Sequence, residues 1–316
     1  GGEDPALEAA ARRDIATFTL LAELDWDQVL AEVGGKAPRE YGPVLANLPR
    51  WRGSSPFSFA ELTEFYRANG AGLFARHRAF LWEDGALCPV EQPDCPGADE
   101  MLGYELQRNR VIANTRAMLE GNLVNNVLLY GDSGTGKSAT VKNLLTLPGF
   151  EALRLIEVQK EGLADLPRLI RTLGGRRLKF ILFIDDLAFD QDDKTYSALK
   201  TILEGGLERR PANVAVYATS NRRRLVRQTF SDRAGDEVDA SETIQEKTSL
   251  SDRFGLRIPY LALNQAEFLE LVEGMAEQAG ITLDRDSLRA EAVKWEMRNP
   301  GRTPRTAKQF IASLSL

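Results

Sequence analysis

The sequence contains few of the side chains that usually carry metal or redox chemistry. Its 316 residues include one histidine and two cysteines. Neither the number nor the spacing of Cys88 and Cys95 fits a zinc site, and a disulfide between them is an alternative that the chain does not need. The histidine, His77, stands between two arginines and is expected at the surface. A zinc centre and a disulfide framework are therefore not expected.

Long hydrophobic runs and an excess of positive charge are also missing. No apolar segment approaches the length needed to cross a bilayer, and the first residues lack the apolar core of a secretory signal. We therefore expect a cytoplasmic protein without membrane contact. Because the net charge is -6, nucleic acid could bind only through a local basic patch. Three consecutive arginines at 222–224 form the densest basic cluster, for which a solvated surface is the alternative.

The chain does contain a phosphate-loop pattern at residues 126–138, NVLLYGDSGTGKS. An apolar, strand-like run breaks into a glycine-rich turn and then meets Lys137 and Ser138, which fits G-x-x-x-x-G-K-[ST]. The glycines let backbone N–H groups turn toward a phosphate chain. Lys137 would neutralise the β- and γ-phosphates, and the Ser138 hydroxyl would reach Mg²⁺. The residues expected to bind the nucleotide are Gly131, Asp132, Ser133, Gly134, Thr135, Gly136, Lys137, Ser138 and Ala139.

Two carboxylates follow a second apolar run, KFILFI at residues 179–184. Buried apolar residues that end in Asp185 and Asp186 need a cation nearby, and a Mg²⁺ opposite Ser138 would supply one. We expect Asp185 to bind the metal, directly or through water, and Asp186 to orient or deprotonate the attacking water. The next apolar run leads to Asn221, whose neutral side chain can touch both the water and the γ-phosphate. Turn-initiating aspartates and a turn-capping asparagine are the alternatives.

Two arginines complete the candidate site. Arg253 precedes the last predicted strand at the domain edge, where it could reach the nucleotide of a neighbouring molecule. An intramolecular pair with Asp252 or with a residue of the acidic loop at 231–247 is the alternative. Arg305 lies in the first turn of the last predicted helix, directly after Pro304, which suits the first helical position. Arg302, before that helix begins, is a weaker candidate for the same role.

After residue 100, apolar runs alternate with helical patterns. The predicted strands are 127–130, 153–158, 179–184, 213–218 and 256–262. Such alternation predicts an α/β fold with a parallel sheet, in which ligands lie beyond the carboxyl ends of the strands. The predicted domains are a helical N-terminal region at 1–100, an α/β nucleotide-binding domain at 101–262 and a helical lid at 263–316. Within the first region we expect a helical set over 57–81 and an extended connector over 88–97.

Taken together, these motifs resemble the AAA+ class of P-loop ATPases over residues 101–316. The resemblance makes 131–138 the Walker A motif, Asp185 and Asp186 Walker B, Asn221 sensor 1, Arg253 the arginine finger and Arg305 sensor 2. It implies a five-stranded parallel sheet with a C-terminal helical lid, ATP and Mg²⁺ as cofactors, adenine held between residues 102–107 and the lid, and self-association through the nucleotide interface. The chain also resembles a bacterial AAA+ family known only as a domain of unknown function, through FARHRAFLW, LLYGDSGTGKS, LRLIEV, FILFIDDL, LEGGLERRP, YATSNRR, LSDRFGL and GRTPRTAKQF.

Departures from known AAA+ subclasses narrow the expected function. Residues 159–162, QKEG, offer no aromatic side chain to grip a threaded polypeptide and leave no room for the extra helix of replication initiators. The Asp-Asp pair resembles that of helicase loaders. We therefore expect an ATPase that drives assembly or remodelling of an unidentified protein or nucleic-acid partner, such as a DNA-linked loader or switch. A nucleotide-binding scaffold with little hydrolysis and a P-loop kinase are the alternatives.

Overall fold

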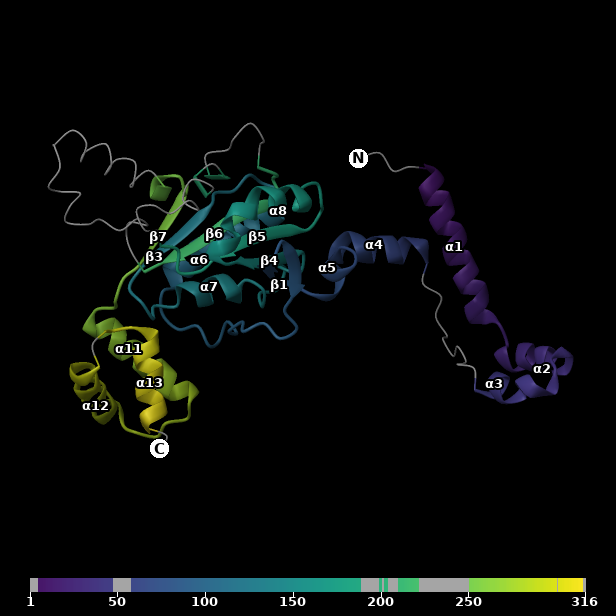
Figure 1. The fold of residues 1–316 in the computed structure, drawn as a ribbon. Helices are drawn as coiled ribbons and strands as arrows, with labels where there is room; N and C mark the ends of the chain where they lie inside the picture. The colour runs from purple at the N-terminus through teal and green to yellow at the C-terminus, as the bar shows by residue number, and fades with distance from the viewer. Residues whose placement is uncertain are drawn as a thin grey trace. The chain divides into compact units, whose positions relative to one another are not determined.

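The computed structural model describes residues 5–47, 58–188, 199–200, 202–203, 210–221, 250–299 and 301–314. The chain divides into two compact units, Gly1–Ala68 and Asn69–Leu316. Figure 1 shows the helices and strands of both units. The basic cluster at 222–224 lies outside the described residues.

The first unit is helical, as its sequence predicts. Its elements are α1 (Pro5–Glu23), α2 (Trp26–Lys36), η1 (Arg39–Tyr41), α3 (Gly42–Ala46) and all but the last residue of α4 (Phe59–Asn69). Asp25 caps α2 by accepting hydrogen bonds from the backbone N–H groups of Asp27 and Gln28. No residue of α1, α2 or α4 is buried, so the apolar stripes of these helices are not covered by a core.

Among the described residues, a seven-stranded sheet forms the centre of the second unit (Figure 1). Its strands are β1 (Ala79–Glu83), β2 (Ala86–Pro89), β3 (Val127–Gly131), β4 (Leu153–Val158), β5 (Lys179–Ile184), β6 (Val214–Ser220) and β7 (Leu256–Tyr260). Their order is β2-β1-β4-β5-β6-β3-β7, and the pairs are parallel except for β1 with β2. The five predicted parallel strands are present with closely similar bounds, which confirms the α/β fold.

The sequence did not predict the hairpin of β1 and β2. The helical set expected over 57–81 ends with α4 and the short α5 (Leu73–Arg76), and the connector expected over 88–97 begins inside β2. Asp84 and Gly85, with φ of +49° and +73°, form the two-residue turn that suits such a hairpin. The difference arises from a contact between distant parts of the chain, because β1 pairs in parallel with β4. Helical periodicity within residues 57–81 cannot reveal that partner.

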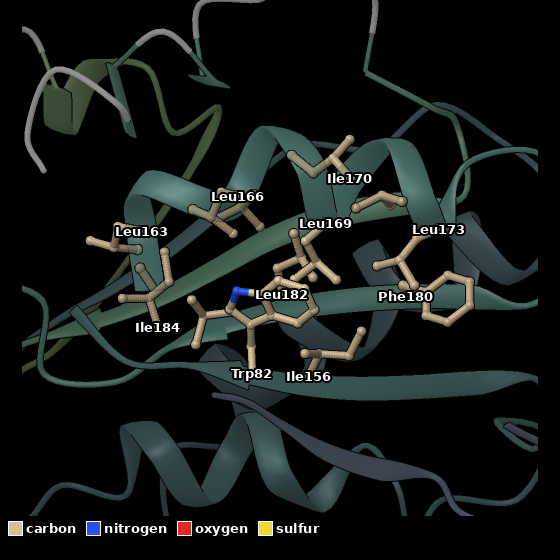
Figure 2. Close-up of a cluster of buried hydrophobic side chains, with 14 of the residues drawn as sticks. Trp82, Ile156, Leu163, Leu166, Leu169, Ile170, Leu173, Phe180, Leu182 and Ile184 are labelled. Atoms are coloured by element: carbon tan, nitrogen blue, oxygen red, sulfur yellow. The ribbon is translucent and has the colours of Figure 1, made fainter. Parts of the chain in front are cut away.

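Apolar layers cover both faces of the sheet. The covering elements are α6 (Glu105–Leu119) and α7 (Lys137–Asn143) on one face, and η2 (Lys160–Asp165) with α8 (Leu166–Leu173) on the other. Figure 2 shows Trp82 of β1 and Leu182 of β5 beneath the apolar residues of α8. Alternate residues of β5 serve the two layers, since Leu182 belongs to the α8 layer and Phe183 to the other. Burial of each such side chain stabilises the fold by about 1.5–3 kcal/mol.

A buried arginine connects β4 to the chain that precedes the sheet. Arg154 is 2% exposed, although it carries a charge. Its guanidinium donates hydrogen bonds to four backbone carbonyls, those of Asn69, Phe74, Glu151 and Leu153. Burial lowers the pKa of Arg154 to about 10, so the side chain is still charged at neutral pH. The carbonyl dipoles therefore stabilise this charge, and the charge in turn holds the backbone of Asn69 and Phe74 beside β4.

Three helices near the C-terminus form a lid with an apolar core of its own. They are α11 (Gln265–Gln278), α12 (Arg285–Arg298) and α13 (Pro304–Leu314), within the region predicted to be helical. Glu273 of α11 accepts hydrogen bonds from Arg285 and Arg289 of α12, and these bonds lower the pKa of Glu273 to about 2. In the segments that the structure describes, none of the helices is long and apolar enough to span a bilayer.

Candidate functional site

Three strand ends meet at the carboxyl edge of the sheet. β3 leads into the phosphate-loop pattern, β5 into Asp185 and Asp186, and β6 into Asn221, and β6 pairs with both other strands. A cleft of about 670 Å³ opens there, beside the start of α13. The predicted site residues that line it are Ser133, Gly134, Thr135, Gly136, Lys137, Ser138, Ala139, Asp185, Asp186, Asn221 and Arg305. Gly131, Asp132 and Arg253 are not part of its lining.

The phosphate loop needs glycine at the two points where other backbone or a side chain comes close. Gly131 has φ +134°, and a Cβ there would lie 2.2 Å from the carbonyl oxygen of Tyr260, at the end of β7. Gly134 has φ +79°, and its Cβ would lie 3.0 Å from the Cβ of Arg305 in α13. Both glycines therefore let the loop fit between the sheet and the lid. The loop then continues directly into α7.

Lys137 lies buried beneath this loop. Its ammonium group donates hydrogen bonds to the carbonyl oxygens of Gly131 at 3.1 Å and Asp132 at 2.6 Å, and to Oδ1 of Asn221 at 2.9 Å. Burial lowers the pKa of Lys137, and neighbouring carboxylates, Asp132 first among them, act in the opposite direction. The three oxygens that accept these hydrogen bonds are neutral. The positive charge is therefore well placed to meet an anion held by the loop.

Asp185 stands opposite Ser138, as the sequence predicts for a metal site. Its Oδ1 accepts hydrogen bonds from the Ser138 hydroxyl at 2.6 Å and from the Thr219 hydroxyl at 2.5 Å. Among the described residues, no group of three or more His, Cys, Asp or Glu could hold a metal ion. A carboxylate and a hydroxyl nevertheless suit Mg²⁺, which typically completes its coordination with phosphate oxygens and water. The donor set therefore fits a magnesium ion that arrives with a nucleotide.

Asp186 is held in an unusual backbone conformation. Its φ of +48° lies in the left-handed region, which costs a residue other than glycine about 1–2 kcal/mol. Two hydrogen bonds maintain this conformation. The N–H of Asp186 donates to the hydroxyl of Thr219 in β6 at 2.9 Å, and Oδ1 of Asp186 accepts from Nδ2 of Asn221, just after β6, at 2.7 Å. Asn221 therefore connects the buried Lys137 to the second acid, a link that the sequence alone does not reveal.

The two lid arginines have different surroundings. Arg305 is exposed at the cleft, with Nη1 3.4 Å from the Ser133 hydroxyl, and its backbone N–H donates to the carbonyl of Gly134 at 3.2 Å. Arg302 donates instead to Glu296 inside the lid, at 2.6 Å, and does not line the cleft. The structure thus brings Arg305 to the phosphate loop and leaves Arg302 in a structural ion pair.

Arg253 lies away from the cleft of its own chain. It is half-buried and follows the helical turn that precedes β7. Its neighbour Asp252 forms an ion pair with Arg257, with a separation of 2.5 Å. Arg253 therefore takes no part in the cluster around Lys137, and the role of an arginine finger is a proposal about a neighbouring molecule.

The segment predicted to hold a base, residues 102–107, lines two cavities. Its first residues face the cleft, and the whole segment lines a neighbouring cavity of about 510 Å³ beside α11. Arg108 supports the segment by donating hydrogen bonds to the carbonyls of Met101 and Gly103. The neighbouring cavity is also lined by Glu105, Glu267 and Glu270.

Sequence reasoning gave no separate role to two residues that shape the site. Thr219 is 2% exposed and bridges the two acids through its hydroxyl. Tyr260 accepts a hydrogen bond from the Asp132 N–H at 2.9 Å, and its own hydroxyl contacts that of Thr140 at 2.9 Å. A threonine at the buried end of an apolar strand is the signal that could have identified Thr219.

No protein of curated function has a significantly similar sequence. Similar solved structures include the Thermotoga maritima RuvB Holliday junction branch migration motor, which is 17% identical, with a TM-score of 0.43 over 70% of this chain and 63% of RuvB. The Aeropyrum pernix ORC1 protein in complex with DNA is 18% identical, with a TM-score of 0.46 over 68% of this chain and 60% of ORC1. The chain thus spans less than two thirds of each of these relatives.

A family model gives the assignment. The model described as "Protein of unknown function (DUF815)" matches residues 75–315, which include the sheet, the phosphate loop, both acids and all three lid helices. The chain belongs to this family.

Proposed function

We propose that this protein is an AAA+ ATPase that binds and hydrolyses Mg-ATP. One observation carries the proposal: the lysine, the hydroxyl, the two acids and the asparagine converge in one hydrogen-bonded cluster at the phosphate loop. Lys137 contacts Asn221, Asn221 contacts Asp186, and Ser138 contacts Asp185. Each residue would then serve a distinct step of phosphoryl transfer.

Three side chains would hold the nucleotide and its metal. Lys137 lies below the loop, where it can exchange neutral carbonyl partners for phosphate oxygens and balance their charge. Ser138 and Asp185 would bind magnesium through oxygen, and their present 2.6 Å hydrogen bond keeps both donors on one side of the cleft. When bound, the metal neutralises charge on the β- and γ-phosphates.

Asp186 and Asn221 would act on the attacking water. Asp186 can accept the water proton, and Asn221 holds that carboxylate in place through its 2.7 Å hydrogen bond. The left-handed backbone of Asp186 turns the carboxylate away from the course of β5 and toward Asn221. A shorter acid can in this way perform a role for which glutamate is more common.

Two arginines would stabilise charge as the γ-phosphate leaves. Arg305 belongs to the same chain and already lies at Ser133, so it would act in cis. Arg253 does not line its own cleft, so it would act on the nucleotide of an adjacent subunit. A cation supplied at that point is worth about 10³-fold or more in rate, while ATP binding needs it much less.

Calorimetry with Mg-ATP tests the binding half of the proposal. Lys137→Ala should weaken ATP binding by about tenfold or more, because a charge-assisted contact is worth roughly 1.5–3 kcal/mol. Lys142→Ala is the matched control, since Lys142 lies on the same helix but does not line the cleft. Equal affinities of the Lys137 variant and the unmodified protein would remove Lys137 from the site. GTP, measured in parallel, decides whether the base pocket prefers adenine.

Mixing two inactive proteins tests hydrolysis between subunits. Asp186→Asn and Arg253→Ala should each bind ATP and turn it over poorly, and their mixture should recover phosphate release, because some interfaces combine an intact Asp186 with an intact Arg253. Arg257→Ala, an exposed arginine nearby, is the control and should need no complementation. If mass spectrometry detects mixed assemblies that stay inactive, Arg253 does not act in trans.

We propose that ATP turnover drives the assembly or remodelling of a macromolecular partner. The Asp-Asp pair resembles helicase loaders and supports a loader or switch acting on a protein or nucleic-acid partner. Purification of Asp186→Asn protein from native cells, with identification of what accompanies it, tests this. Fluorescence anisotropy with DNA at low salt tests a weak contact through residues 222–224.

Two alternatives to an ATPase predict different results. A scaffold with little hydrolysis would bind ATP equally well and release no phosphate in steady state, and a kinase would transfer phosphate to a small molecule.

A further inference from the structure

The phosphate loop is connected to the base of the lid by an acid that the loop pattern does not require. In G-x-x-x-x-G-K-[ST], the second position is free, and here it is Asp132. Oδ2 of Asp132 accepts a hydrogen bond of 2.6 Å from the backbone N–H of Ala262. Ala262 lies between the end of β7 and the start of α11, which is the link from the sheet to the lid. The contact joins residues 130 positions apart in the chain.

Backbone contacts strengthen the same connection. The N–H of Asp132 donates to the carbonyl of Tyr260 at 2.9 Å, so both the backbone and the side chain of Asp132 bind the chain that leads to the lid. At the other end of the lid, the N–H of Arg305 donates to the carbonyl of Gly134 at 3.2 Å. The phosphate loop is therefore attached to the lid at its entry and at the first turn of α13.

An acid at this position needs a reason, because it works against anion binding. A carboxylate beside a loop that receives phosphates repels them, although water screens part of the effect at an exposed residue. Asparagine or serine could also accept a hydrogen bond from Ala262, but a carboxylate accepts a shorter and stronger one. Asp132 does not line the cleft, and its carboxylate accepts a hydrogen bond from the link to the lid.

We propose that Asp132 is a positioning residue that couples the phosphate loop to the angle of the lid. This inference rests on the proposed nucleotide binding and deepens it. A nucleotide that draws the loop inward would pull on Ala262 and so favour one lid position. A partner that moved the lid would, reciprocally, move the loop and change the affinity for nucleotide. Through this contact, a partner protein that binds the lid could lower the affinity for ATP and so promote its release.

Distances between two spin labels test the coupling. The labels are attached to cysteines introduced by Glu120→Cys, at an exposed position after α6, and Met297→Cys, at a position on α12 that is 81% exposed. The full-length background carries Cys88→Ser and Cys95→Ser, so that only the introduced cysteines react. Double electron–electron resonance then gives the distribution of sheet-to-lid distances with and without Mg-ATP. The variants are Asp132→Ala, which removes the acceptor, and Asp132→Asn, whose amide oxygen can still accept the Ala262 N–H.

Asp132→Ala should broaden the distance distribution of the nucleotide-free protein and abolish the narrowing caused by ATP. KM for ATP should rise about fivefold, as expected for one exposed hydrogen bond, while kcat changes much less. Asp132→Asn should keep a narrow distribution. Ala262→Pro, which removes the donor and keeps the acid, should behave like Asp132→Ala and serves if that variant folds poorly.

An unchanged distance distribution in both Asp132→Ala and Ala262→Pro would overturn the inference. So would an Asp132→Asn distribution as broad as that of Asp132→Ala, because the charge and not the hydrogen bond would then be responsible. The nucleotide-free measurements need no ATP. If the unmodified protein binds no ATP, the proposed function fails, and those measurements still decide whether Asp132 holds the lid.

Discussion

Replacing Thr219 with valine would remove the hydroxyl that bridges Asp185 and Asp186 at the end of β5, while keeping the shape of the side chain. The Thr219 hydroxyl donates to Asp185 at 2.5 Å and accepts from the Asp186 N–H at 2.9 Å. Valine supplies neither contact. Asp185 would then lose one of the two hydroxyl groups that hold it, and Asp186 would lose a support for its left-handed backbone.

The two lost contacts set the expected magnitude. A hydrogen bond to a carboxylate is worth about 1.5–3 kcal/mol, and water can replace part of it at the exposed Asp185. The Asp186 N–H also has Oδ1 of Asp185 at 3.1 Å, so its loss is partial. We expect a loss of about 2 kcal/mol in the free energy of unfolding. If Asp185 binds magnesium, losing the partner that orients it should weaken apparent magnesium affinity by about 10–100-fold.

Urea denaturation and steady-state phosphate release at varied Mg²⁺ measure the two effects. Thr219→Ser is the matched control, because it keeps the hydroxyl and loses only a methyl group. Serine should restore the magnesium dependence, whereas valine should not. If Thr219→Val protein is as stable as the unmodified one and has the same magnesium requirement, the proposed role of the Thr219 hydroxyl in orienting Asp185 is wrong.

Three further substitutions test other contacts of the structure. Arg154→Met leaves buried carbonyls without their donor and should cost about 3 kcal/mol of unfolding free energy in urea titrations, with Arg154→Lys less severe. Glu273→Gln should cost about 1 kcal/mol at neutral pH after allowance for solvent screening, and because the folded pKa of Glu273 is about 2 against a usual 4.5, the difference in melting should shrink as pH falls below about 4.5. Gly134→Ala should push against Arg305 at a cost of about 1–2 kcal/mol and weaken ATP binding about tenfold by calorimetry.

Local sequence was sufficient for the elements that carry the candidate site. The run 126–138 predicted a strand, a glycine-rich turn and a helix, and the structure has β3, the loop and α7 there. The bounds of β4 and β5 were also close to those predicted. These features depend on periodicity, caps and glycine positions within a few neighbouring residues, which a single sequence displays directly.

The hairpin of β1 and β2 lay beyond that kind of reasoning. Its residues carry apolar side chains at spacings that suit either a helix or a strand, and the pairing of β1 with β4 selects the strand. The buried Arg154 belongs to the same class of feature, since its acceptors include the carbonyl of Asn69, 85 positions earlier in the chain. Local pattern reports which side chains are apolar but not which distant backbone they meet.

The sequence by itself determined the α/β fold, the phosphate loop and the identity of its lysine, hydroxyl and acids, because these depend on local spacing. Only the tertiary structure decided how those groups are held. Asn221 meets both Lys137 and Asp186 because β6 lies between β3 and β5, and Asp132 meets the lid link because β7 lies beside β3. Strand order places residues in contact that are far apart in the chain, and no local pattern encodes that order.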